Sequence, residues 1–487
     1  MTDWQRLDPR MLLVHPVHEV LRQLPVLVGS FVLGSATGNP LWAVLGVGLI
    51  VAYGAARWFT TAYRIGPDDV QLRSGVLQRK VVSLPRNRIR SVSTDARLLH
   101  RLLGLTVVTV STGQQASAET AFALDAVTAA EVPKLRATLL AESLGPAAAH
   151  VPGQVLARWQ PSWLRYSPLT FAGVLTIAAA AGVLSQTGVL GALENSPWPQ
   201  AGAGVVETFG VAAVVAVAMV AFLVASAALS VTQSLLTYGN LVLRRDADIL
   251  HLSHGLLRVR EHTFDMRRLR GGTLREPLLV RLFGGARLDA VMTGVAGSGE
   301  ASQLLPPCPR ATASSVLRQL IDEPDMVDGP LRKHGPAAVR RRWVRAMAVP
   351  VVAALAAAVA AAFAPVPAWV WVGTGVLAAA GAALAVDRSR ALGHRVGAGW
   401  LAAQAGSLDR RRDCVAGAGV VAWTVRQSWP QRRAGLATLV AATAAGVKHY
   451  EVVDVPAELA WEIAATVTPW VGASSWAWER PGRLASD

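Results

Sequence analysis

The chain has 487 residues, of which 52% are hydrophobic and only 16% are charged. This composition is too apolar and too poor in charge for a soluble multidomain protein, so it indicates a membrane protein. The net charge of +15 could suggest a nucleic-acid partner. However, the arginines lie beside apolar segments, without the interleaved aromatic residues that stack on bases. An anionic membrane surface explains the charge more simply, and we expect no nucleic-acid partner.

Long intervals without charged residues predict the membrane helices. One crossing needs roughly 20 apolar residues, and the motifs "ATGNP" (36–40) and "FAPVPA" (363–368) would reverse the chain inside their intervals. We therefore predict six crossings in three helical hairpins, at 23–58, 168–236 and 346–386. The first hairpin is short for two spans, so a single crossing there stays open.

The basic residues predict the orientation of these hairpins. The three predicted turns contain no Arg or Lys, whereas arginines crowd the opposite ends of the helices. By the positive-inside rule those ends are cytoplasmic. We expect a multi-pass protein of the inner (plasma) membrane, with a cytoplasmic N-terminus (1–22) and a cytoplasmic C-terminal tail (471–487). Acidic residues ahead of the first apolar run argue against a cleavable signal peptide.

Between the hairpins the chain repeats itself. Residues 72–104 align with residues 252–284 without a gap, and a weaker third copy keeps the same 29-residue spacing (435 − 406) between two glycines. Such matches indicate a duplicated unit. The residues that define the three copies are Gly75, Arg101 and Gly104, then Gly255, Arg281 and Gly284, then Gly406, Arg432 and Gly435.

One copy predicts a small, strongly bent sheet closed by a helix. In the first, strands are expected at 68–75, 76–85 and 88–94, a short amphipathic turn at 98–104, strands at 105–111 and 120–126, and a helix at 126–143. Gly104 would let the backbone turn tightly into the next strand. We interpret the repeated phrase "LLHRLLG" as a structural corner.

This order of elements, with "RIRSV" (88–92) and "LLHRLLGL" (98–105) following a membrane hairpin, resembles the bacterial pleckstrin-homology-like, membrane-flanked domain family. The resemblance is strongest in the first copy and weakest in the third. It implies three pleckstrin-homology (PH)-like units at 63–142, 237–322 and 395–470, the last degenerate. The expected fold class is therefore α-helical membrane hairpins plus α+β cytoplasmic domains. The resemblance implies a plasma-membrane location and no particular reaction.

Two basic segments at equivalent positions are candidate contacts for anionic lipid or a protein partner. They contain Arg86, Arg88 and Arg90 in the first copy and Arg267, Arg268 and Arg270 in the second. The alternative is a solvated face of the sheet.

Motifs for catalysis or metal binding are weak. His251 and His254 have metal-ligand spacing, but their context predicts a strand and turn, where solvated histidines are expected. Cys308 and Cys414 fall in predicted cytoplasmic segments and indicate neither a disulfide nor a metal cage. We expect no cofactor, no metal and no enzymatic activity.

The sequence thus favours a non-enzymatic inner-membrane scaffold that presents PH-like units to a protein partner or an anionic lipid surface. The alternative is a lipid or small-molecule transporter built on the six-helix bundle. Transporters usually carry ionisable groups within their spans, whereas here Gln186 and Gln233 are the most polar candidates. The identity of the partner, the oligomeric state and the packing of the three units stay open.

Overall fold

The computed structural model describes residues 4–6, 8, 10, 56, 59–75, 78–86, 89, 91–96, 98–111, 122–135, 139, 153–170, 172–186, 210–294, 302–397 and 399–473. The predicted first hairpin lies almost entirely outside these residues, as do Arg88 and Arg90. The chain forms two compact units. Unit 1 comprises residues 1–159 and 235–268, and unit 2 comprises residues 160–234 and 269–487.

The described part of unit 1 contains two antiparallel sheets. The first has the order β1-β2-β3-β4 and consists of β1 (Gln5–Arg6), β2 (Ala62–Ile65), β3 (Asp69–Ser74) and β4 (Lys80–Pro85). The second has the order β7-β6-β5-β11-β10-β9-β8. Its strands are β5 (Ser91–Ala96), β6 (Leu105–Ser111), β7 (Phe122–Thr128), β8 (Gln154–Arg158), β9 (Val242–Asp246), β10 (Ile249–His254) and β11 (Val259–Asp265). β-Branched residues in β5 and β6 bury one face of this sheet in a core that includes Val92, Val108 and Leu124.

The residues that the structure describes in unit 2 also form two antiparallel sheets. The larger has the order β14-β13-β12-β17-β16-β15 and the smaller the order β18-β19-β20. Their strands are β12 (Leu269–Pro277), β13 (Gly285–Met292), β14 (Gln303–Pro309), β15 (Gly393–Gly397), β16 (Trp400–Ala405), β17 (Asp409–Ala416), β18 (Val420–Arg426), β19 (Leu436–Thr443) and β20 (His449–Pro456). Two amphipathic helices, α11 (Arg310–Leu320) and α16 (Ala457–Val467), follow β14 and β20 and bury apolar residues at helical spacing.

Consecutive repeats share sheets. Strand β5 of the first copy pairs with β11 of the second, and β12 of the second pairs with β17 of the third. The two junctions have the same register, because Asp95 opposite Arg260 and Arg275 opposite Arg411 are equivalent positions in the repeat. We call each junction a seam. The boundary between the two units falls at Arg268, so the middle copy contributes one half to each unit.

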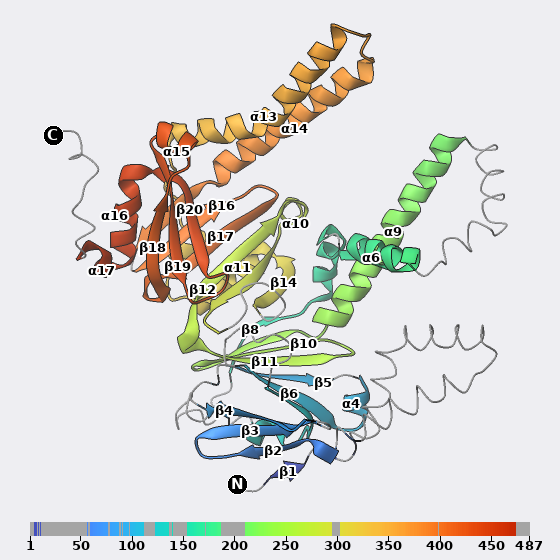
Figure 1. Cartoon of the computed structure of the whole chain (residues 1–487), viewed down its shortest axis with the longest axis vertical. Coiled ribbons are helices and arrows are strands. Elements are labelled where there is room, and N and C mark those ends of the chain that lie inside the picture. The colour runs from blue at the N-terminus through green and yellow to red at the C-terminus, as the bar shows by residue number, and fades with distance from the viewer. Residues whose placement is uncertain are drawn as a thin grey trace. The chain divides into compact units, whose positions relative to one another are not determined.

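Among the described residues, three helices are long and apolar enough to cross a membrane: α9 (Val211–Tyr238), α13 (Pro336–Ala361) and α14 (Ala368–Ala391). A fourth crossing would require a bent pair, formed by the 3₁₀ segment Pro161–Thr170 and the first part of α6 (Ala172–Gln186), with an angle of 52° between them. Helices α13 and α14 pack side by side as a hairpin (Figure 1). They are joined at the predicted "FAPVPA" turn, where Pro365 and Pro367 end the helical run.

Candidate functional site

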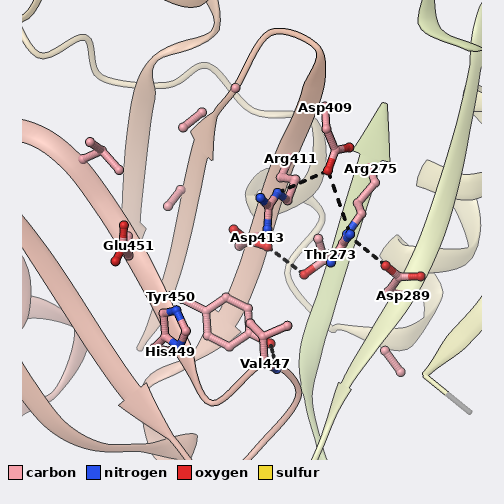
Figure 2. A pocket seen from close by; sticks show the side chains of 15 residues that line it. Thr273, Arg275, Asp289, Asp409, Arg411, Asp413, Val447, His449, Tyr450 and Glu451 are labelled. Atoms are coloured by element: carbon pink, nitrogen blue, oxygen red, sulfur yellow. Dashed lines mark hydrogen bonds and ion pairs between the residues drawn. The ribbon is translucent and has the colours of Figure 1, made fainter. Parts of the chain in front are cut away.

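The second seam borders a polar cavity of about 410 Å³ in unit 2. Strands β12, β13, β16, β17 and β20 supply its walls, so the cavity lies where the second and third repeats meet (Figure 2). The lining side chains that carry charge or a polar group are Thr273, Arg275, Asp289, Asp409, Arg411, Asp413, His449, Tyr450 and Glu451.

Both arginines of this lining pair with carboxylates of the same lining. Arg275 Nε lies 3.0 Å from Asp289 Oδ2, and Arg275 Nη1 lies 3.9 Å from Asp409 Oδ2. Asp409 also accepts Arg411 at 3.4 Å. Figure 2 shows Arg275 between the two carboxylates. The cavity is therefore held together by a network of alternating charges.

Burial sets the proton affinity of the acids in this cavity. Burial raises the pKa of Asp289, and the nearby Arg287 and Arg275 oppose part of that shift. Burial also raises the pKa of Asp413, although the hydroxyl of Thr273 donates to its carboxylate at 2.7 Å and favours the charged form. Within the described residues no group of three or more His, Cys, Asp or Glu is arranged to hold a metal ion.

The first seam carries an equivalent ion pair with its charges exchanged. Asp95 on β5 accepts a bidentate interaction from Arg258, whose Nε donates to Oδ1 at 2.7 Å and whose Nη2 donates to Oδ2. In the repeat, Asp95 corresponds to Arg275 and Arg258 corresponds to Asp409. Bidentate geometry makes this one of the stronger kinds of ion pair at a partly exposed position.

The repeat-defining glycines occupy two kinds of turn. Gly75, Gly255 and Gly406 have φ of 123°, 109° and 101°, and a Cβ there would lie within 2.2 Å of a backbone carbonyl oxygen. Gly104, Gly284 and Gly435 have φ of 72°, 74° and 65°, with open space around them. A side chain would be excluded at the first set by collision, and at the second set it would face only left-handed backbone strain.

Each of the three corner glycines accepts a hydrogen bond at the end of its repeat. The carbonyls of Gly104, Gly284 and Gly435 receive the backbone N–H groups of Ala129, Arg310 and Ala457 at 2.9, 3.0 and 3.0 Å. Arg310 and Ala457 are the first residues of α11 and α16. In the second and third repeats the corner thus satisfies an N–H at the start of the following helix, which would otherwise lack a partner inside the helix.

The repeated arginines connect one repeat to the first turn of the next. Arg101 donates to the carbonyl of Leu256, which follows Gly255. Arg281 pairs with Asp387 at 2.8 Å, and Asp387 also binds Arg410 of the third repeat at 2.6 Å. Arg432 belongs to the last repeat and is exposed.

The four described candidate contact arginines are divided between the two units and have different surroundings. In unit 1, Arg86 donates to the Pro67 carbonyl at 2.7 Å, and Arg267 and Arg268 both pair with Asp265. In unit 2, the stem of Arg270 lies against Gly419. Arg267 remains exposed on its guanidinium side and is the most accessible of the four.

The cysteines and one of the two histidines are buried. Cys308 and Cys414 are fully buried, and burial raises the pKa of both thiols to about 12. His254, expected as a solvated turn residue, is instead buried, and that prediction is wrong. Its Nδ1 lies 2.7 Å from the Thr237 carbonyl and its ring stacks near His262.

The base of the α13–α14 hairpin is tied to the sheets of unit 2. Asp387 near the end of α14 binds Arg281 of the second repeat and, at 2.6 Å, Arg410 of the third. The backbones of Arg332 and His394 exchange two hydrogen bonds, and the imidazoles of His334 and His394 meet at 2.9 Å. Both ends of the hairpin are therefore fixed to the domain.

A family model for the bacterial PH domain matches residues 21–143 and 344–469, just over half of the chain. The chain belongs to the bacterial PH domain family. It is a membrane protein with tandem bacterial PH domains and long apolar helices between them. The second match covers the third copy, in which the sequence resemblance is weakest, up to residue 469. No curated protein and no solved structure matches the chain.

Sequence reasoning missed the seams and the strand β8. The sequence contains a signal for the seams. The repeat position that holds Asp95 in the first copy holds Arg275 in the second, and the position that holds Arg258 in the second copy holds Asp409 in the third, so both charges reverse together. That exchange identifies a contact only if the two positions are suspected to be neighbours. Strand β8 pairs with β9 but lies in the linker outside the repeat, so no internal comparison could find it.

Proposed function

We propose that this bacterial PH domain protein is a non-enzymatic scaffold whose three PH-like repeats form platforms at the cytoplasmic membrane surface for a protein partner. In this proposal each repeat consists of two three-stranded half-sheets closed by a helix. The helices are α11 and α16 in the last two repeats and the helical residues 132–135 in the first. Because sheets are shared across the seams, neighbouring repeats would not move as independent domains joined by flexible linkers.

The observation that carries the proposal is the double attachment of Asp387. This residue of α14 binds Arg281 and Arg410, which belong to consecutive repeats. The buried carboxylate of Asp454 on β20 likewise binds Arg341 and Arg342 at the start of α13. Membrane helices and sheets are thus joined by partly buried ion pairs, as expected of an anchor that holds a platform in place.

The polar groups of the described membrane helices favour a scaffold over a transporter. Gln233 of α9 donates to the Thr176 hydroxyl of α6 at 2.7 Å, and the Ser230 hydroxyl accepts the Gly173 N–H at 2.7 Å. Such pairs stabilise helix packing in a bilayer. They leave these particular groups engaged with each other rather than directed at a solute.

The thiols favour a structural role over a catalytic one. A nucleophilic cysteine needs a lowered pKa and access to substrate. Burial gives Cys414 the opposite character, since it raises the pKa to about 12. The Cys414 Sγ instead donates to the Met326 carbonyl at 3.2 Å, so the side chain contributes to packing under β17.

The experiment that tests the proposal places a photo-crosslinking residue at Arg267 in the full-length protein in native membranes. Arg318 is the matched control, because both arginines are about half exposed and pair with an aspartate. We expect one discrete protein adduct at position 267 and none at 318. A lipid adduct alone at position 267 would contradict the protein partner.

A second variant separates the scaffold from a transporter. Residues 347–361 of α13 and 368–384 of α14 are replaced by unrelated apolar sequence of equal length, with Arg341, Arg342 and Asp387 kept. Continued burial of Cys414 shows that unit 2 still folds. A scaffold keeps the position-267 adduct at the yield of the parent protein. Loss of the adduct from a folded variant would contradict the scaffold.

A further inference from the structure

Two short helices occupy the same place in the second and third repeats. They are α10 (Leu278–Leu282) and α15 (Trp429–Arg433), which correspond residue by residue with an offset of 151 (432 − 281). In unit 1 the first repeat has α4 (Leu98–Leu102) at the equivalent position. We call these the corner helices.

The corner helices expose large apolar side chains. Phe283, directly after α10, is 63% exposed, and Trp429, at the start of α15, is 65% exposed. Leu282 and, in unit 1, Leu102 are also mostly exposed. Leu102 and Leu282 occupy the same position of the repeat, whereas Phe283 and Trp429 occupy different positions of two equivalent helices. Exposed apolar side chains gathered on equivalent helices mark a contact surface more strongly than scattered ones do.

In unit 2 both corner helices lie at the base of the α13–α14 hairpin. Arg281 of α10 pairs with Asp387 in the last turns of α14. Ser428, the N-cap of α15, accepts a hydrogen bond from Arg341 in the first turns of α13 at 3.3 Å. Figure 1 shows α15 beside the start of α13.

The sequence of the hairpin indicates how deep its base, and so the corner helices of unit 2, would lie in the membrane. Its apolar stretch runs from residue 346 to 386, and charged residues cluster immediately outside it, at 340–345 and 387–390. Charged side chains at the ends of a span lie in the headgroup region. Because Arg341 and Asp387 hold the corner helices, Phe283 and Trp429 lie next to that region.

The side-chain contacts of Trp429 suit a position in the headgroup region. The guanidinium of Arg433 lies over its ring, 3.8 Å from the centroid. Tryptophan is enriched at the membrane interface, where its ring is apolar and its N–H stays hydrated, and arginine binds lipid phosphate beside it. A stacked Trp–Arg pair presents both groups to a lipid headgroup.

We propose that α10 and α15 insert Phe283 and Trp429 into the interfacial layer of the phospholipid bilayer. This seats unit 2 on the membrane at two points beside its hairpin. The inference requires only that the hairpin spans a bilayer, so it does not depend on the scaffold having a protein partner.

The buried native cysteines make a direct test possible. Cys308 and Cys414 are fully buried, so a thiol reagent labels a newly introduced cysteine selectively. The variants are Phe283→Cys and Trp429→Cys in the full-length protein, each labelled with an environment-sensitive fluorophore in phospholipid vesicles. Trp470→Cys is the matched control, since Trp470 is 51% exposed on α17 (Pro469–Gly472), which lies away from the hairpin in Figure 1.

We expect lipids brominated near the headgroup end of their chains to quench labels at 283 and 429 several-fold more than the label at 470. Iodide in the aqueous phase should quench in the opposite order. Three results would overturn the proposal: iodide quenching at 283 and 429 equal to that at 470, equal bromolipid quenching at all three positions, or protection from both quenchers. The last would show that protein rather than lipid covers the corner helices.

Discussion

Replacing the arginine of a seam should have very different effects in the two units. Arg275→Met removes the central cation of the second seam, and Arg258→Met removes the cation of the first. Methionine keeps much of the aliphatic volume, so the two variants differ mainly in the charge interaction they lose. We expect Arg275→Met to destabilise unit 2 strongly and Arg258→Met to destabilise unit 1 weakly.

The exposure of the paired groups sets the two magnitudes. The side chains of Arg275 and Asp289 are only 18% and 9% exposed. Breaking a buried pair costs about 3–5 kcal/mol, and the remaining contact from Arg287 to Asp289 places the loss at the lower end, about 3 kcal/mol. The side chains of Arg258 and Asp95 are 43% and 23% exposed. Water screens that pair, so its loss costs about 1 kcal/mol.

The native cysteines report on unit 2 alone. Both lie in unit 2 and become reactive only when its sheets open. Thiol labelling along a urea series therefore gives the unfolding midpoint of unit 2. With a urea dependence of about 1–3 kcal/mol per molar, a loss of about 3 kcal/mol lowers that midpoint by roughly 1–3 M.

The Arg258→Met variant is the control in the same labelling assay. Arg258→Met lies in the other unit and should leave the labelling curve of the cysteines in place. If Arg275→Met also leaves it in place, the buried ion pair does not stabilise the second seam and the reasoning is wrong. Equal shifts for both variants would refute the independence of the two units.

Three further outcomes are expected. Gly284→Ala should lower the free energy of unfolding of unit 2 by about 1–2 kcal/mol through left-handed strain. Gly406→Ala should lower it more, because its Cβ would lie 2.2 Å from the Asp409 carbonyl oxygen. Cysteine labelling in urea ranks the two variants, and the reverse order would contradict the two kinds of turn. Unit 2 should lose stability as pH falls from 6.5 to about 4, because burial lowers the pKa of His394 to about 4 and the unfolded chain binds the proton first. His394→Gln should make this loss smaller. An unchanged pH profile in that variant would exclude His394 as its cause. Topology reporters after Arg245 and Arg345 should lie on one side of the membrane and a reporter at Pro365 on the other. The reason is that the described helices place only one span between positions 345 and 365. If all three reporters lay on the same side, α13 and α14 could not form a membrane hairpin.

Local features of this protein could be predicted from sequence because each depends on neighbouring residues. The break at Pro365 follows from the geometry of proline. The spacing of Gly255 and Gly284 marks two turns at positive φ in every copy. The short corner helix at "LLVRL" follows from a brief apolar run closed by glycine.

Strand partners could not be predicted because they depend on tertiary packing. Alternating residues in β5 indicate which face is buried but not which edge meets another strand, and its partner β11 lies more than 160 residues away (260 − 95). The burial of His254 has the same origin, since Tyr238 and His262 from other elements pack against its ring. Arg268 and Arg270 align with Arg88 and Arg90 as one basic segment, yet the unit boundary separates Arg268 from Arg270.

The exchanged charges of the two seams bear on the order in which the repeats assemble. The seams have equal register, so backbone pairing alone would not distinguish one half-sheet from another. Pairing the first repeat with the third would place Asp95 beside Asp409, and pairing two copies of the second would place Arg275 beside Arg258. Like charges at such positions oppose association, whereas the native order gives an attractive pair at both seams. The exchange therefore supplies the specificity that a repeated backbone lacks.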